Sequence, residues 1–106
     1  MYLSRMPFHV LPGKTSEVEE RLGRLKEMIG AAGGQNCRIL RSHFASDGAP
    51  DVVLEQEVEN LSTLETQIQT VTADPEFQEW SREMSPLLVR PPKREAYLIN
   101  GDSHHR

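Results

Sequence analysis

The order of hydrophobic patterns along the chain is the feature that most restricts its fold. Apolar residues alternate with polar ones over Met1–Leu11, whereas residues 16–32 place apolar residues every three or four positions. A period of two indicates a strand, and the longer spacing indicates an amphipathic helix. The remaining segments are predicted to be two strands, a helical region and a last short strand: Asn36–Ala45, Asp51–Val58, 60–88 and Arg94–Ile99.

Short local motifs predict where the helices begin and end. Ser16 and Glu19 have the spacing of a capping box. The second helical region is predicted to begin at Asn60 or Ser62. Asp74 followed by Pro75 is a further start signal, so this region is predicted to be two helices or one sharply bent helix. Gly33 and Gly34 are predicted to end the first helix in a left-handed conformation.

The order strand, helix, strand, strand, helix, strand is typical of a ferredoxin-like α+β fold. In that fold four antiparallel strands form one sheet in the spatial order fourth, first, third, second, with the helices on one face. The more apolar strand residues are predicted to face the helices: Met6, Phe8, Val10, Leu40, Phe44, Val52, Leu54 and Val58. We predict one domain over residues 1–100 and a flexible tail over residues 101–106.

The other face of the predicted sheet mixes aliphatic residues with charged residues and histidines. Its predicted members are Leu3, Leu11, Ile39, Val53, Arg5, His9, Arg41, His43, Glu55 and Glu57. This face is too apolar for a solvated surface and too charged for a packed interior. We therefore expect a second copy of the chain to cover it and to enclose a polar cavity, which makes a homodimer. The alternative is an exposed face with cross-strand ion pairs.

Composition excludes several classes of function. The 106 residues carry 12 Lys+Arg and 16 Asp+Glu, a formal net charge of −4, which argues against nucleic acid as a partner. The longest apolar runs are a few residues, so no membrane-spanning helix is expected. The N-terminal residues lack the pattern of a secretory signal. Cys37 is the only cysteine, which fits a reducing cytosol, and we expect a cytoplasmic protein.

Three segments carry a resemblance to a known superfamily: Val10–Lys14, Asp74–Trp80 and Ser85–Leu88. They resemble the dimeric α+β barrel superfamily, particularly its NIPSNAP-like and antibiotic-biosynthesis-monooxygenase-like branches. The resemblance implies a homodimer whose sheets face each other, with ligand pockets between sheet and helices. Members include cofactor-independent oxygenases, haem-degrading enzymes and proteins of no assigned activity. Haem-degrading members carry an axial histidine on the second helix, and residues 62–88 contain none, so we predict no cofactor.

His43, His9 and Glu55 are the candidate catalytic residues. An imidazole beside a carboxylate forms a general acid/base pair. The alternative is a hydrogen-bonded histidine in the subunit interface. The same three residues have the composition of a two-histidine, one-carboxylate metal site, but their spacing does not demand one, and we predict no metal. His104 and His105 are expected to be solvated in the tail.

The candidate ligand-binding residues are one arginine and three aromatic residues. Arg41 can bind an anion, although a salt bridge to Glu55 or Glu57 is the competing interpretation. The aromatic candidates can form a pocket wall or simply belong to the core: Trp80, Phe77 and Tyr97. Cys37 is expected to be a small buried residue. The basic cluster after the helices is expected to be solvated: Arg90, Lys93 and Arg94.

These observations predict a NIPSNAP-like dimeric α+β barrel protein of unassigned activity that binds a small, partly apolar molecule. The alternative is a cofactor-independent monooxygenase acting on a quinol or phenolic substrate, so the enzymatic status stays open. Such chemistry needs a dry pocket and a base. His9 or His43 would be that base, and Trp80 would be a pocket wall.

Overall fold

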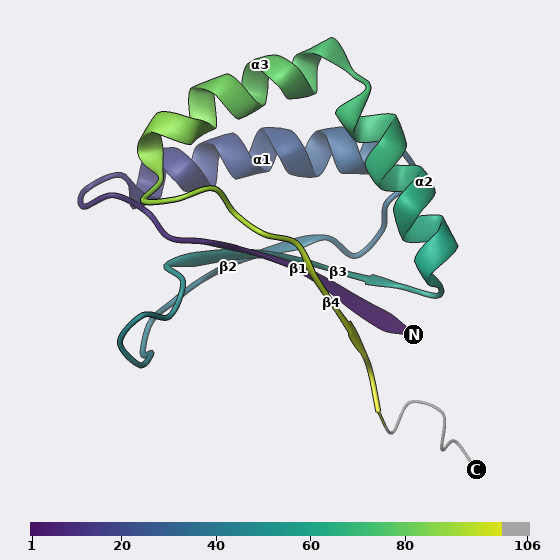
Figure 1. Ribbon diagram of the computed structural model, residues 1–106, viewed down its shortest axis with the longest axis horizontal. Coiled ribbons are helices and arrows are strands. Elements are labelled where there is room, and N and C mark those ends of the chain that lie inside the picture. The colour runs from purple at the N-terminus through teal and green to yellow at the C-terminus, as the bar shows by residue number, and fades with distance from the viewer. Residues whose placement is uncertain (101–106) are drawn as a thin grey trace.

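The computed structural model describes residues 1–100, and the predicted tail with His104 and His105 lies outside the described residues. The elements in chain order are β1 (Tyr2–Phe8), α1 (Thr15–Ala31), β2 (Arg38–Arg41), β3 (Val52–Val58), α2 (Leu61–Thr72), α3 (Pro75–Met84), the 3-10 turn η1 (Ser85–Leu87) and β4 (Glu95–Leu98). The strands form one antiparallel sheet in the order β2-β3-β1-β4. All helices lie on one face of it (Figure 1). The predicted ferredoxin-like topology is confirmed.

The core fills the space between the sheet and the helices. Phe8 of β1 faces Val52 of β3 in the register, and both side chains are fully buried. Val18 and Leu22 of α1, spaced by four residues, are buried against them in the same cluster. Burial of one such side chain contributes roughly 1.5–3 kcal/mol, so this layer supplies much of the stability.

The prediction for β2 assigned its residues to the wrong faces. Ile39 pairs with Leu54 and therefore faces the helices, whereas Leu40 pairs with Val53 on the outer face. Because Ile39 and Leu40 are adjacent apolar residues, alternation cannot choose between them, and a slip of one position exchanges the faces. Phe44, predicted to be in the core, is 92% exposed in the loop after β2, because strand pairing ends before it.

Two of the predicted helix starts are correct and one is not. Asp74 accepts a hydrogen bond from the backbone N–H of Glu76 (2.9 Å), and Asn60 accepts one from Thr63 (2.9 Å), so α2 and α3 are separate capped helices. The Ser16 capping box does not form, because α1 begins one residue earlier, at Thr15, with Lys14 at the N-cap. Of the two glycines predicted to be left-handed, Gly33 has a positive φ (94°) and Gly34 does not.

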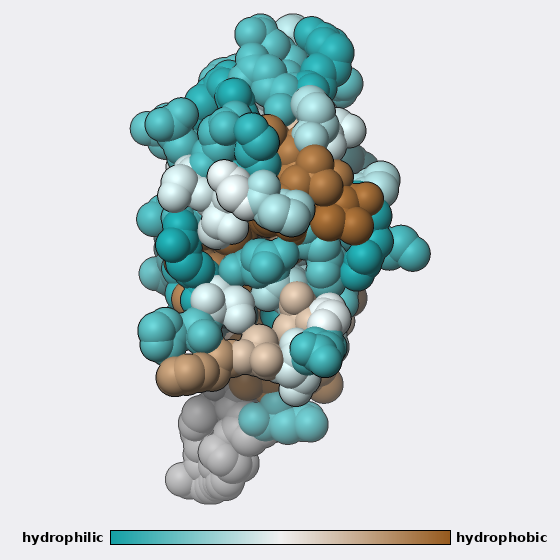
Figure 2. Space-filling view, turned by 90° about the vertical axis from the view of Figure 1, so that its left-hand side faces the viewer, coloured by the Kyte–Doolittle hydropathy of each residue, from teal (hydrophilic) through white to brown (hydrophobic). Residues whose placement is uncertain are grey.

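The sheet continues past β1 as a short two-stranded ribbon. Val10 pairs with Leu88, and Leu11 and Val89 remain partly exposed beside this pair. On the side of the molecule that carries the loop after β1, Figure 2 shows a concentrated hydrophobic area among hydrophilic atoms. Within residues 1–100, no helix has the length and apolar character needed to cross a bilayer.

Candidate functional site

The larger of two notable cavities lies beside α3, and we call it the aromatic groove. Its volume is about 480 Å³. It is lined by residues of β1, α3, η1 and the segment before β4, including Met6, Phe77, Trp80, Leu88, Val89 and Arg90. Two of the four predicted ligand-binding residues, Trp80 and Phe77, therefore line one cavity.

Trp80 is held in place by α1. Its indole Nε1 donates a hydrogen bond to the backbone carbonyl of Arg21 (2.6 Å), and the residue is 3% exposed. Its ring stacks on Phe77, with centroids 5.5 Å apart and planes at 26°. Phe77 is only half-buried, so the pair forms both a part of the core and a fixed aromatic wall of the groove.

A row of polar and small residues crosses the helix-facing side of the sheet. Ser4 of β1 pairs with Gln56 of β3 and with Ala96 of β4. Ser4 and Gln56 are buried, although the neighbouring position on the same face pairs Met6 with Leu54. This row was not predicted from the sequence. The available signal was a polar residue at an apolar position of the alternation in β1 and again in β3.

Arg94, an exposed residue, reaches this row with its guanidinium group, which corrects the prediction of a wholly solvated basic cluster. Its Nη1 donates a hydrogen bond to Ser4 Oγ (3.1 Å), and its Nη2 lies 4.0 Å from Met6 Sδ. Partial burial lowers the pKa of Arg94. Burial likewise raises the pKa of the Cys37 thiol, an effect larger than the opposing influence of Lys26 and Arg94, so this thiol is not activated.

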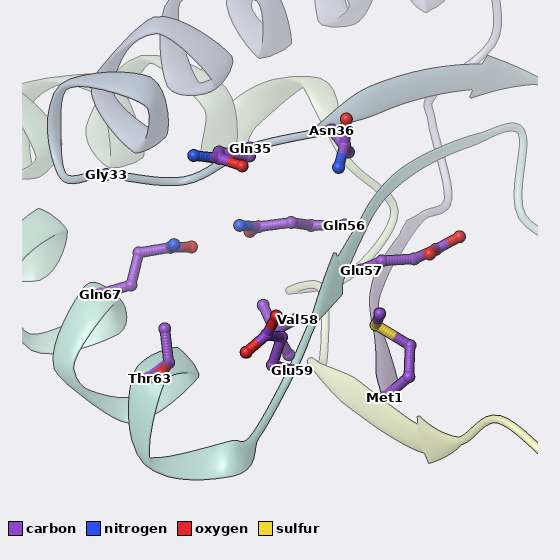
Figure 3. Close-up of a pocket in the computed structure, with 10 residues that line it drawn as sticks. All are labelled: Met1, Gly33, Gln35, Asn36, Gln56, Glu57, Val58, Glu59, Thr63 and Gln67. Carbon is purple, nitrogen blue, oxygen red and sulfur yellow. The ribbon is translucent and has the colours of Figure 1, made fainter. Parts of the chain in front are cut away.

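The second cavity, which we call the amide pocket, opens at the end of the sheet between β3, α2 and the α1–β2 loop. Its volume is about 310 Å³. Most of its polar side chains are amides, and the lining includes Gln35, Asn36, Gln56, Glu59, Thr63 and Gln67. Figure 3 shows the amide groups of Gln56 and Gln67 pointing into the same space from β3 and α2. These two residues are only 6% and 7% exposed.

The three predicted catalytic residues lie outside both cavities. Glu55 is on the outer face of the sheet, where Arg38 Nη2 lies 2.8 Å from its carboxylate and Arg5 Nε lies 3.9 Å away. His43 is exposed in the loop after β2. Its ring packs edge-on against the ring of Phe44, with the ring centroids 4.5 Å apart. His9 follows β1, and its backbone carbonyl accepts from Val89 (2.8 Å). Their acid/base role stays a prediction.

The other two predicted ligand-binding residues make protein contacts instead of lining either cavity. Arg41 faces α1, and its Nε donates to Glu19 (2.8 Å), a hydrogen bond that raises the pKa of Arg41. Tyr97 lies on the outer face and donates to Glu95 (2.9 Å), which raises the pKa of Tyr97. Arg41 thus forms a salt bridge, but its partner is Glu19, and the predicted partners Glu55 and Glu57 are wrong. Within residues 1–100, no group of three His, Cys, Asp or Glu side chains is arranged to hold a metal ion.

Solved structures share this fold across nearly the whole chain. A NIPSNAP-like domain protein from Burkholderia xenovorans is 23% identical, with a TM-score of 0.69 over 96% of this chain and 87% of that one. A protein from Nitrosomonas europaea, described as a "putative antibiotic biosynthesis monooxygenase", is 18% identical, with a TM-score of 0.69 over 94% and 99%. A dimeric ferredoxin-like protein of unknown function from Thermobifida fusca is 12% identical, with a TM-score of 0.65 over 92% and 90%.

No protein-family model matches the sequence, and no curated protein matches it. The structure therefore establishes the fold of this chain, which is the ferredoxin-like α+β fold. More particularly, it is the fold of NIPSNAP-like and antibiotic-biosynthesis-monooxygenase-like proteins, as the sequence resemblance predicted. Because this fold carries many activities, function must be argued from the cavities.

Proposed function

We propose that the protein binds a small, partly apolar molecule in the aromatic groove. The observation that carries this proposal is the stacked pair of Phe77 and Trp80, which forms a fixed wall of a 480 Å³ cavity. Ligand sites are typically concave, mostly apolar and supplied with a few polar groups. Arg90 lines the groove beside the apolar residues and supplies a cation for a phenolate or carboxylate group.

The chemistry of the lining favours binding over catalysis. Its titratable member is Arg90, and the ten lining residues include no Asp, Glu or His that can remove a proton near neutral pH. The groove thus offers apolar contact and one positive charge, which suits retention of a ring compound more than its chemical conversion.

The test uses 1-naphthol, a phenolic ring compound. Trp80 is the only tryptophan, so its indole N–H gives one resolved resonance in a ¹H–¹⁵N spectrum. Saturable movement of that resonance is expected, with weaker binding in Phe77→Ala. The matched control is Phe44→Ala, which removes an exposed ring outside the groove and should bind as the wild type does. No saturable movement, or equal binding by Phe77→Ala, would count against the proposal.

We further propose that the protein works as a homodimer paired through the outer face of the sheet. Leu40 and Tyr97 are exposed there, next to the ion pairs of Glu55 with Arg38 and Arg5. Apolar side chains that lie beside paired charges suit burial against an identical surface. Sedimentation equilibrium should give a dimer mass, whereas a monomer at high concentration would contradict this proposal.

The single cysteine also supports a cytoplasmic location, which cell fractionation tests.

The second candidate function is a cofactor-independent monooxygenase, supported by the fold shared with proteins described by that name. In such a reaction 1-naphthol and O₂ would yield 1,4-naphthoquinone and water, with one oxygen atom retained in the quinone. Oxygen consumption with a panel of quinols and phenols tests it. Consumption that is lost in His43→Ala or His9→Ala would support the predicted base, and an inert wild type would exclude this activity for the panel.

A further inference from the structure

The amide pocket contains two side chains that a structural role does not explain. Gln56 and Gln67 are more than nine-tenths buried, on a strand and a helix whose neighbouring inward residues are apolar: Leu54, Val58, Leu64 and Val71. Leucine would fill either position without burying a polar group. Buried amides are normally hydrogen-bonded, because an unpaired amide loses its bonds to water without compensation.

Within residues 1–100, no hydrogen bond joins either amide group to the protein, and both amides open onto the pocket, since the fully buried side-chain atom without a partner in this part of the chain is Nε of Arg21. By contrast, the exposed Gln78 donates from Nε2 to the carbonyl of Thr72 (3.0 Å), and the buried Ser4 accepts from Arg94. The donors and acceptors of Gln56 and Gln67 are instead directed into the pocket (Figure 3). Two free amides therefore meet in one cavity of about 310 Å³.

The loop above the pocket keeps space for one of these amides. A Cβ placed on Gly34 would approach Gln56 Nε2 to 3.0 Å and would collide with Ile29. Glycine at this position therefore lets the Gln56 amide lie against bare backbone. This contact with bare backbone supplies no hydrogen bond to the Gln56 amide.

We propose that the amide pocket is a second binding site, for an uncharged group that presents an N–H donor beside a carbonyl acceptor, as a carboxamide or lactam does. A glutamine amide offers donors and an acceptor in one plane, so such a group can satisfy both at once. A ketone can use only the donors. The site has no lining residue in common with the aromatic groove, so it does not depend on the function proposed there.

The side-chain charge of the lining disfavours anionic ligands. Glu57 and Glu59 are among the ten lining residues, which include no Lys or Arg side chain. The carboxylate of Glu57 turns away from the cavity in Figure 3, and Glu59 lies at the pocket wall. A carboxylate ligand would meet the negative charge of Glu59 without a compensating Lys or Arg side chain, whereas a neutral amide of the same shape would not.

Three probes of nearly equal shape test this inference: benzamide, acetophenone and benzoate. Each is titrated into ¹⁵N-labelled protein, and the side-chain NH₂ resonances of Gln56 and Gln67 are followed. We expect benzamide to move both and to bind about tenfold more tightly than acetophenone, because it makes the additional hydrogen bond to an acceptor in the pocket. Benzoate should leave both resonances in place. Unmoved resonances with benzamide, or equal binding of the three probes, would overturn the proposal.

Variants separate the site from general effects. Gln56→Leu and Gln67→Leu should abolish the preference for benzamide while keeping a folded spectrum. Gln69→Leu changes the same residue type on the exposed side of α2 and should retain wild-type binding. Loss of benzamide binding in Gln69→Leu would place the binding elsewhere and refute the assignment.

Discussion

Replacing the buried amide at Gln56 or Gln67 with leucine should stabilise the protein. Most large changes at buried positions lower the free energy of unfolding. Here the wild-type side chain is largely buried, its amide faces the pocket without a hydrogen bond to the protein within residues 1–100, and leucine has similar volume with no polar atom. The opposite sign is therefore expected, and it follows directly from the interpretation of these residues as a binding site.

The magnitude follows from the burial of the two amides. An unsatisfied buried amide costs about 1–3 kcal/mol relative to a bonded one. Both glutamines line the 310 Å³ cavity, where water can reach part of each amide, so the lower end of this range applies. We expect each substitution to raise the free energy of unfolding by about 1 kcal/mol, which corresponds to about 4–8 °C in Tm for a domain near this size.

Urea unfolding and thermal unfolding, both followed by circular dichroism, measure this change. Gln69→Leu is the control on the exposed side of α2 and should alter the free energy of unfolding by less than about 0.5 kcal/mol. A loss of more than about 1 kcal/mol in Gln56→Leu or Gln67→Leu would show that the amide makes a stabilising bond in the wild type. That result would refute the argument that these residues are retained for a ligand.

Three further substitutions test other contacts. Leu40→Asp on the outer face should convert the proposed dimer to a monomer in sedimentation, whereas Leu61→Asp, equally exposed on α2, should leave the mass unchanged. Trp80→Phe removes the 2.6 Å hydrogen bond to α1 and should lower the free energy of unfolding by about 2 kcal/mol in urea; an unchanged value would contradict the assigned anchor. The hydrogen bond from Arg24 lowers the pKa of Glu83 in the folded protein. The ionised Glu83 therefore contributes to the free energy of unfolding in full at pH values above its unfolded pKa of about 4, and this contribution is lost as the pH falls through the lower folded pKa. Glu83→Gln should therefore be less stable than wild type at neutral pH and equal to it in strong acid, and a constant difference in urea unfolding would contradict this.

The order of elements could be predicted from the sequence because periodicity reports burial directly. The apolar stripe of α1, the Asp74–Pro75 start of α3 and the alternation in β1 each depend on local geometry alone. The faces of β2 could not be predicted in this way. Its four residues contain two adjacent apolar side chains, and its register depends on long-range contacts such as the ion pair between Arg38 and Glu55.

The candidate catalytic residues were chosen by residue type, and none of them lines either cavity, so their role stays a prediction. Histidine and glutamate titrate, so they stand out in a sequence, but Glu55 is paired with arginines and His43 is exposed in a loop. By contrast, Trp80 and Phe77 line a cavity, because aromatic residues on the apolar stripe of a helix adjoin both the core and its margin, and their role in binding a ligand stays a prediction.

Departures from periodicity are a better guide to an interior site than residue chemistry. Ser4 in β1 and Gln56 in β3 each occupy a position that the alternation reserves for an apolar side chain, and Gln67 does so in α2. Each exception is unremarkable alone, because single buried polar residues occur in most cores. The register places Ser4 opposite Gln56, and both glutamines face one cavity, so the exceptions converge in space although they are separate in sequence. Polar residues at three converging positions make this part of the core polar. We infer that it binds an amide group, and the Gln56 and Gln67 variants test that inference.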